Sequence, residues 1–279
     1  MSFQPVVPLS GYAGWRAFLR SSERQQQAFA DQAEIKRNLA YFSEKIRSEP
    51  STAELVGDRR LLSVALGAFG LAEEIDKRAI IRKALEEGVI DPASFANRLN
   101  DSRWKAFAAA FSEDSRALGQ FTSSEFIAGI ESKFVEQSFE RAVGDSDSNV
   151  RLALNFRREI ATIANGSNVD KVGWLQVMGS KPLRAVLEAA FNLPSSLASI
   201  DLDQQKAAFE ERAATVIGSS SASALSDPEK VERVIRRFFA ITETQGGGAA
   251  SYGMQLATTL FQSPSQSTAN LFTAALSRR

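Results

Sequence analysis

The sequence predicts an all-α fold with two homologous multi-helix units and a C-terminal helical tail. Three observations favour this class. Apolar residues recur every three or four positions in one segment after another, which is the spacing of a helix face. Helix-start and helix-stop signals separate these segments. Alternating runs of β-branched residues between turn dipeptides, which are typical of strands, are almost absent.

The first half is expected to open with one long helix, or two in series, over about residues 12–48. Pro50 ends this segment. The capping box Ser51-Thr52-Ala53-Glu54 follows, in which Ser and Glu can satisfy the free amides of a new first turn. Further helices are expected over residues 59–70, over residues 76–87 with a stop at Gly88, and over residues 102–112.

Two more start signals follow along the chain. Asp91-Pro92 places an N-cap before a helix-start proline, and Thr122-Ser123-Ser124-Glu125 is a second capping box. The helix that this box opens is expected to end, or to be interrupted, at Asp145 to Asn149. The remaining expected helices are residues 150–164, 170–178, 180–192, 202–217 and 228–243.

The two halves of the chain resemble each other, which indicates an internal duplication. Residues 61–71 align with residues 183–193 at a spacing of 122, and residues 99–102 align with residues 225–228 at a spacing of 126. Asp31 and Phe42 align with Asp145 and Phe156 at a spacing of 114. We therefore expect a first unit with a long entry helix at residues 1–143, a second at residues 144–243, and a glycine-linked helical tail at residues 244–279.

The composition excludes several kinds of chemistry. The 279 residues include no His and no Cys. Without them, Ser-His-Asp and Cys-His catalysis, disulfides and Cys-ligated metal centres cannot be built. We expect neither a metal nor a cofactor, and we expect no enzymatic activity.

Charge and hydropathy limit the classes of partner that we expect. Lys plus Arg and Asp plus Glu are 33 each, so the chain lacks the basic excess that nucleic-acid binders usually carry. No apolar run reaches membrane-spanning length, and no signal peptide is visible before Arg16. We expect a cytoplasmic protein without an integral membrane segment and without a nucleic-acid partner. A non-cleaved export route would leave no such mark and is the alternative.

Three short patterns resemble parts of known binding or catalytic sites, but none is a complete site. Asp145 to Asn149 copies the first half of a calcium loop, but Val150 and Phe156 stand where that loop needs Gly and Glu. The triple glycine at residues 246–248 has no preceding strand and no following Lys, so it does not form a phosphate-binding loop. The carboxylate pairs at residues 73–74 and 86–87 are expected at helix ends on the surface.

A pattern of packing residues carries a family resemblance. It consists of Ala68-Phe69-Gly70-Leu71, Ile80, Leu85, Gly88-Val89-Ile90-Asp91, Phe95, Leu99, Asp101-Ser102-Arg103, Phe107 and Phe111. It resembles a bacterial family of unknown function, often labelled flagellar protein, whose genes tend to lie beside flagellar basal-body and motor genes. The resemblance covers about residues 25–140 and, more weakly, continues to about residue 243; the second copy lacks the Gly-Val-Ile-Asp segment. It implies an all-α fold and a flagellar connection, and it implies no catalytic residue.

The sequence thus favours a structural, assembly or regulatory protein of the flagellum that acts by protein–protein contact, with self-association as an option. An exported axial-type component is one alternative. An enzyme that uses carboxylates, Ser or Lys is another. The expected contact residues lie on a basic helix face and in the apolar tail: Lys230, Arg233, Arg237, Tyr252, Leu256, Leu260, Leu271 and Phe272.

Overall fold

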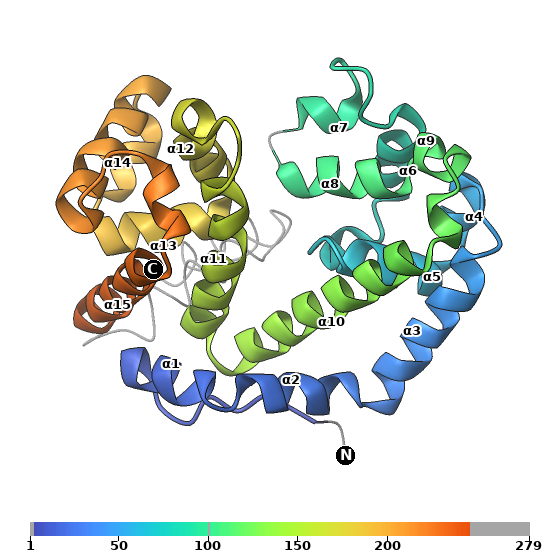
Figure 1. The fold of residues 1–279 in the computed structure, drawn as a ribbon, viewed down its shortest axis with the longest axis horizontal. Helices are drawn as coiled ribbons and strands as arrows, with labels where there is room; N and C mark the ends of the chain where they lie inside the picture. Colours follow the sequence, from blue (N-terminus) through green and yellow to red (C-terminus); the bar gives the residue numbers. More distant parts are fainter. Residues whose placement is uncertain (1–2, 100, 246–279) are drawn as a thin grey trace, which may run out of the picture. The chain divides into compact units, whose positions relative to one another are not determined.

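A computed structural model describes residues 3–99 and 101–245, and every regular element in these ranges is helical (Figure 1). The predicted all-α class is therefore confirmed. The chain divides into two compact units, residues 1–154 and residues from 155 onward. Most of the expected tail, from residue 246, lies outside the described residues. Each unit is described separately below.

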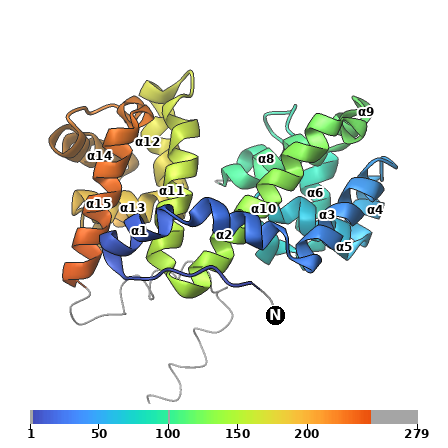
Figure 2. The ribbon, with the colours of Figure 1, turned by 60° about the horizontal axis from the view of Figure 1, so that its bottom comes forward.

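Unit 1 is a cluster of helices closed by one long helix. Figure 2 shows α3 and α5 beside α10, the longest helix of the unit. The described elements are α1 (Gly11–Leu19), α2 (Ser22–Ala30), α3 (Ala33–Ile46), α4 (Thr52–Gly57), α5 (Arg59–Gly67), η1 (Ala72–Glu74), α6 (Arg78–Glu87), α7 (Phe95–Arg98), α8 (Ser102–Phe111), α9 (Glu113–Ala117), η2 (Gln120–Thr122) and α10 (Ser124–Ser146). The next helix, α11 (Ser148–Ala164), begins in unit 1 and continues into unit 2.

The expectation of one long helix, or two in series, over about residues 12–48 is wrong in number, because this segment forms three helices, α1, α2 and α3. At the first break, the hydroxyls of Ser21 and Ser22 donate to the carbonyls of Phe18 and Leu19, at 3.1 and 3.0 Å. Such local bonds compete with the helix ladder. At the second break, Gln32 adopts an extended backbone with ψ of 137°.

Of the three predicted start signals discussed here, one is confirmed, one is displaced and one is wrong. The capping box at Ser51 is confirmed, since Ser51 N donates to Glu54 Oε2 (2.9 Å) and Glu54 N donates to Ser51 Oγ. The second box is displaced: Ser123 caps α10 and Thr122 does not. The Asp91-Pro92 start is wrong, because α7 begins only at Phe95, after Ser94.

Aromatic rings fill the core of unit 1. Phe111, 2% exposed, contacts the largest set of rings. Its neighbours, with centroid distances between 5.5 and 6.4 Å, are Phe42, Phe69, Phe107, Phe121 and Phe126. These residues come from α3, the α5–η1 turn, α8, η2 and α10. One ring therefore joins segments that are far apart in the sequence.

Unit 2 packs its helices around a smaller aromatic core. Its described elements after α11 are α12 (Val169–Gly179), α13 (Lys181–Phe191), η3 (Ser195–Ser199), α14 (Leu202–Ile217), η4 (Ala222–Ser226) and α15 (Pro228–Gln245). Trp174, Phe191 and Phe209 contact one another at centroid distances of 5.8 to 6.3 Å. The indole Nε1 of Trp174 donates to Ser220 O at 2.7 Å, which ties the Ser/Gly segment before η4 to this core.

The two aligned segments of the expected duplication end in the same local geometry. After α5, Leu71 N donates to Leu66 O at 2.9 Å; after α13, Leu193 N donates to Glu188 O at 2.8 Å. Each is the long bond of a Schellman-type helix end. The bonds are shifted by the same 122 residues as the sequences. The duplication of whole units stays a prediction.

The compact units meet in the chain at Leu154 and Asn155, inside α11. The boundary that the sequence suggests, at residue 143, instead lies near the turn between α10 and α11. Of the Asp145 to Asn149 segment, only Asp147 lies between the two helices, and its Oδ1 accepts hydrogen bonds from Asn149 N (2.9 Å) and Val150 N (3.0 Å). It acts as a helix cap.

Candidate functional site

The loop between α6 and α7, residues 88–94, is the best-defined candidate for contact with another molecule. Asn97 Nδ2 donates to the carbonyls of both Val89 and Asp91, each at 2.8 Å. The two accepting carbonyls flank Ile90 in the chain. A single amide group therefore fixes the backbone on both sides of that residue.

Further bonds hold both ends of the loop. Asp91 Oδ1 accepts from Ala93 N at 2.8 Å, and Ser94 N donates to Asp91 O at 2.9 Å. Glu87 Oε2 accepts from Phe95 N at 2.5 Å. The Asp91-Pro92 pair thus makes a turn stabilised by the Asp91 side chain.

A close approach to α9 positions the start of the loop. Gly88 has a positive φ of 58°, and a Cβ there would lie 3.0 Å from Asp114 Oδ2. Glycine is suited to both conditions, because it has no Cβ. Asp114 belongs to the first turn of α9, and Leu118 N bonds to Asp114 O one turn later. The loop and α9 therefore belong to one end of unit 1.

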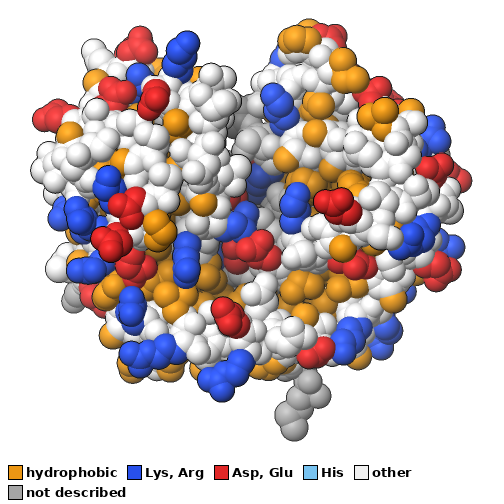
Figure 3. Space-filling view, in the orientation of Figure 1, with side chains coloured by type: hydrophobic (Ala, Val, Ile, Leu, Met, Phe, Trp, Pro, Cys, Tyr) orange, Lys and Arg blue, Asp and Glu red, His pale blue; other side chains and the backbone are white. Residues whose placement is uncertain are grey.

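This end of unit 1 exposes apolar side chains. Ile90 and Leu118 are each 76% exposed, the largest values among the large apolar residues that the structure describes. Figure 3 shows apolar side chains over α7 and α9. Glu86, Asp91 and Asp114 are exposed in the same region. We call Ile90, Leu118 and these three carboxylates the loop-end surface.

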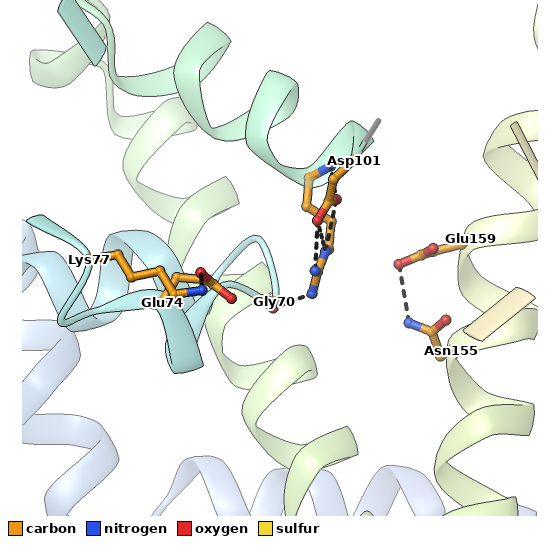
Figure 4. A network of polar contacts seen from close by, with 7 residues as sticks. Gly70, Glu74, Lys77, Asp101, Asn155 and Glu159 are labelled. Atoms are coloured by element: carbon orange, nitrogen blue, oxygen red, sulfur yellow. Dashed lines mark hydrogen bonds and ion pairs between the residues drawn. The ribbon is translucent and has the colours of Figure 1, made fainter. Parts of the chain in front are cut away.

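A polar network lies at the ends of α5 and α8. Arg103 Nη1 donates to Gly70 O at 2.8 Å, and its Nη2 pairs with Asp101 Oδ2 at 2.7 Å (Figure 4). Lys77 pairs with Glu74 at 2.7 Å in the same view. In unit 2, Asn155 Nδ2 donates to Glu159 Oε1 at 3.1 Å, along α11. Each of these bonds stabilises a helix end or joins two side chains along one helix, which is a structural role.

The carboxylate pairs noted in the sequence are largely neutralised by cations. Glu73 pairs with Arg141, Glu74 with Lys77, and Glu87 more loosely with Lys83 at 3.7 Å. Within the described residues, no group of three or more metal-ligating side chains is assembled. None of the described helices combines the length and the apolar composition of a membrane-spanning segment.

The basic face of α15 lies partly in structural contacts. Arg233 and Arg237 are exposed and Lys230 is half-buried. Arg237 Nε donates to Ala190 O at 2.9 Å, near the end of α13, so this side chain helps to cap a helix. The other five expected contact residues, Tyr252, Leu256, Leu260, Leu271 and Phe272, lie outside the described residues.

Sequence reasoning missed the loop-end surface. It grouped the segment Gly88-Val89-Ile90-Asp91 with packing residues, whereas Ile90 is exposed. The available signal was Asn97, which lies six residues beyond Asp91 and can satisfy two carbonyls at once. Helical periodicity does not reveal such a bond, because it depends on how a loop folds back.

The fold and the loop-end surface define an all-helical protein in which one apolar loop is held rigidly. The family model described as "Protein of unknown function (DUF1217)" matches residues 68–231, more than half of the chain, and the chain belongs to this family. A crystal structure of a protein from Agrobacterium tumefaciens is similar, with a TM-score of 0.68 and 30% sequence identity. That similarity covers 87% of this chain and 99% of the Agrobacterium chain. No curated protein matches the sequence.

Proposed function

We propose that this chain is a non-enzymatic protein of the flagellum that acts by protein–protein contact, with a structural, assembly or regulatory role. The flagellar part of the proposal is supported by the sequence resemblance over residues 25–140. The contact part is supported by one observation: Ile90 is 76% exposed on a loop whose flanking carbonyls are both fixed by Asn97.

A fixed loop favours binding for an entropic reason. Ordering a mobile loop on association costs free energy, and a loop that is already ordered avoids this cost. Burying an isoleucine side chain contributes about 1.5–3 kcal/mol. Single exposed apolar residues are common on protein surfaces. Ile90 differs from such single exposed residues because hydrogen bonds fix the backbone on both sides of it.

The charges around the loop indicate the chemistry of the partner. Glu86, Asp91 and Asp114 are exposed, and so are the cations Arg82, Lys83 and Arg98 in the same part of the chain. Lys83 is directed to Glu87 and to the Phe95 ring, at 3.7 and 5.4 Å. Complementary potentials steer association. The matching partner surface offers an apolar pocket for Ile90, with charges at its rim that complement these carboxylates and cations.

A second contact through the basic face of α15 stays a prediction. Lys230 and Arg233 are the side chains of that face that can meet an acidic partner without breaking the Arg237–Ala190 bond. The same holds for the expected contact through the tail, which the described residues do not include.

A deletion strain of the source bacterium tests the flagellar part. We expect loss or reduction of swimming, with restoration by the wild-type gene. Normal flagellar assembly and normal swimming after deletion would contradict the flagellar assignment. Complementation with Ile90→Asp, compared with Leu202→Asp in unit 2, where the side chain is 51% exposed, then tests whether the loop carries the function.

A further inference from the structure

The turn between α11 and α12 contains an exposed Asn-Gly pair. Asn165 is the one asparagine of the sequence that a glycine follows, and both Asn165 and Gly166 are exposed. Asn168, in the same turn, is exposed too but is followed by Val169. The turn belongs wholly to unit 2, and Figure 2 shows it at the end of the two helices that it joins.

An Asn-Gly pair can lose ammonia without an enzyme. The main-chain nitrogen of the glycine gives up its proton and attacks the side-chain carbonyl carbon of the asparagine. The new N–C bond closes a five-membered succinimide, the Cγ–Nδ2 bond breaks, and the side-chain amide leaves as ammonia. Water then opens the ring at either carbonyl and gives aspartate or isoaspartate. Glycine favours ring closure, because it has no side chain to obstruct the attacking nitrogen.

In the folded turn, hydrogen bonds hold both reacting groups. Asn165 Nδ2 donates to Ala161 O at 2.7 Å, which directs the side chain back along α11. Gly166 N donates to Ile163 O at 3.0 Å. Ring closure requires the Gly166 nitrogen to lose this proton and to approach Asn165 Cγ. The folded turn therefore opposes the reaction.

These bonds depend on the last turn of α11. Helix ends open more often than helix interiors, and such local opening leaves the rest of the fold in place. The backbone N of Asn165 also donates to Ala161 O, at 3.2 Å, so the main chain and the side chain of Asn165 share one acceptor. Fraying of this single turn frees both of them together.

The product of the reaction cannot restore the turn. An ionised carboxylate at position 165 has no proton to donate to Ala161 O. It also places a negative charge at the C-terminal end of α11, where the helix dipole disfavours anions. Isoaspartate in addition routes the main chain through the former side chain. The modification therefore weakens the helix end at which it occurs.

We propose that Asn165 is a site of spontaneous deamidation that the end of α11 controls. The folded turn slows the reaction, opening of the last helical turn permits it, and the new negative charge keeps that turn weakened. The extent of modification thus reports how often this end of unit 2 opens. The reaction needs no partner, so the inference is independent of the proposed function and goes beyond it.

Peptide mass spectrometry of the full-length chain after incubation in neutral buffer tests the site. Asn168 is the internal control, because it is exposed in the same turn. Deamidation should be more than about tenfold faster at Asn165, since the β-branched Val169 obstructs attack at Asn168. Unfolding in urea should speed the reaction at Asn165 further. Equal rates at the two asparagines would overturn the site, and a rate that urea does not increase would overturn its control by the fold.

Ala161→Gly tests the role of the helix end in the folded chain. It keeps the accepting carbonyl and the Asn-Gly pair, and Ala161 is exposed. Because glycine weakens a helix, the variant should raise the rate at Asn165 about fourfold. Ala214→Gly, at an exposed position of α14, is the matched control and should leave the rate unchanged. Circular dichroism confirms that both variants are folded. An unchanged rate in Ala161→Gly, or an equal increase in both variants, would overturn control by the end of α11.

Discussion

Gly70 and Asn192 occupy the same left-handed region of backbone space, with φ of 69° and 54°, at positions that the sequence alignment pairs. Among non-glycine residues, asparagine adopts this conformation most readily. The second unit thus satisfies the same backbone requirement with a different residue.

Substitutions at these two positions should differ in a predictable way. Gly70→Ala should destabilise the protein by roughly 1–2 kcal/mol, because alanine is strained at this φ. Its Cβ would also lie 3.2 Å from Gln137 Oε1. Asn192→Gly should change the free energy of unfolding by less than about 0.5 kcal/mol. Urea unfolding of the full chain measures both, and equal losses would contradict the argument.

The ring of Phe111 should be the most sensitive position of the aromatic core in unit 1. Phe111→Ala should cost about 3–5 kcal/mol, because it removes a fully buried ring and leaves a cavity. Leu118→Ala is the control, since this side chain is 76% exposed and should lose little. Urea unfolding monitored by circular dichroism compares them. A small loss at Phe111 would show that neighbouring rings can collapse into the space.

Stability should decrease in acid through carboxylates that bind helix starts. Hydrogen bonds from the Thr52 hydroxyl and backbone lower the pKa of Glu113, although burial opposes them. Burial also opposes the lowered pKa of Asp58, where bonds from Leu61 N, the Tyr41 hydroxyl and Arg60 N dominate. These stabilising contributions are present above the unfolded pKa values of about 4 and are lost as pH falls through the folded values.

Glu113→Gln tests the pH effect. It should weaken the decrease in the free energy of unfolding between about pH 5 and pH 2, since one group with a lowered pKa is removed. The exposed carboxylate Glu125 provides the control variant, Glu125→Gln. An identical pH dependence in the wild type and in Glu113→Gln would argue that Glu113 titrates normally in the folded protein.

Much of the fold follows from the sequence, because helical periodicity and local caps need only neighbouring residues. α14 matches its expected range, and the start of α4 follows from Ser51 and Glu54. The position of the break after α1 could not be predicted, because it depends on serine hydroxyls that bond back to the chain. The exposure of Ile90 was missed for a related reason: Asn97 acts on a loop six or more residues away.

The loop clamp should determine how well Ile90 is presented. Asn97→Ala should increase amide hydrogen exchange in residues 88–94, because two carbonyls lose their donor. Asn97→Asp is a sharper variant of similar size, since a carboxylate cannot donate to either carbonyl. Exchange in α14, in the other unit, serves as the internal reference. Unchanged exchange in the loop would mean that other bonds hold it.

Site-specific photo-cross-linking at position 90 in living cells tests the central claim that the loop-end surface binds another protein. A photoreactive amino acid replaces Ile90 in one strain and the exposed Lys105 in a control strain. We predict a discrete protein adduct at position 90 that is absent at position 105 and is weakened by Glu86→Lys. No adduct at position 90, or the same adduct at both positions, would contradict the claim.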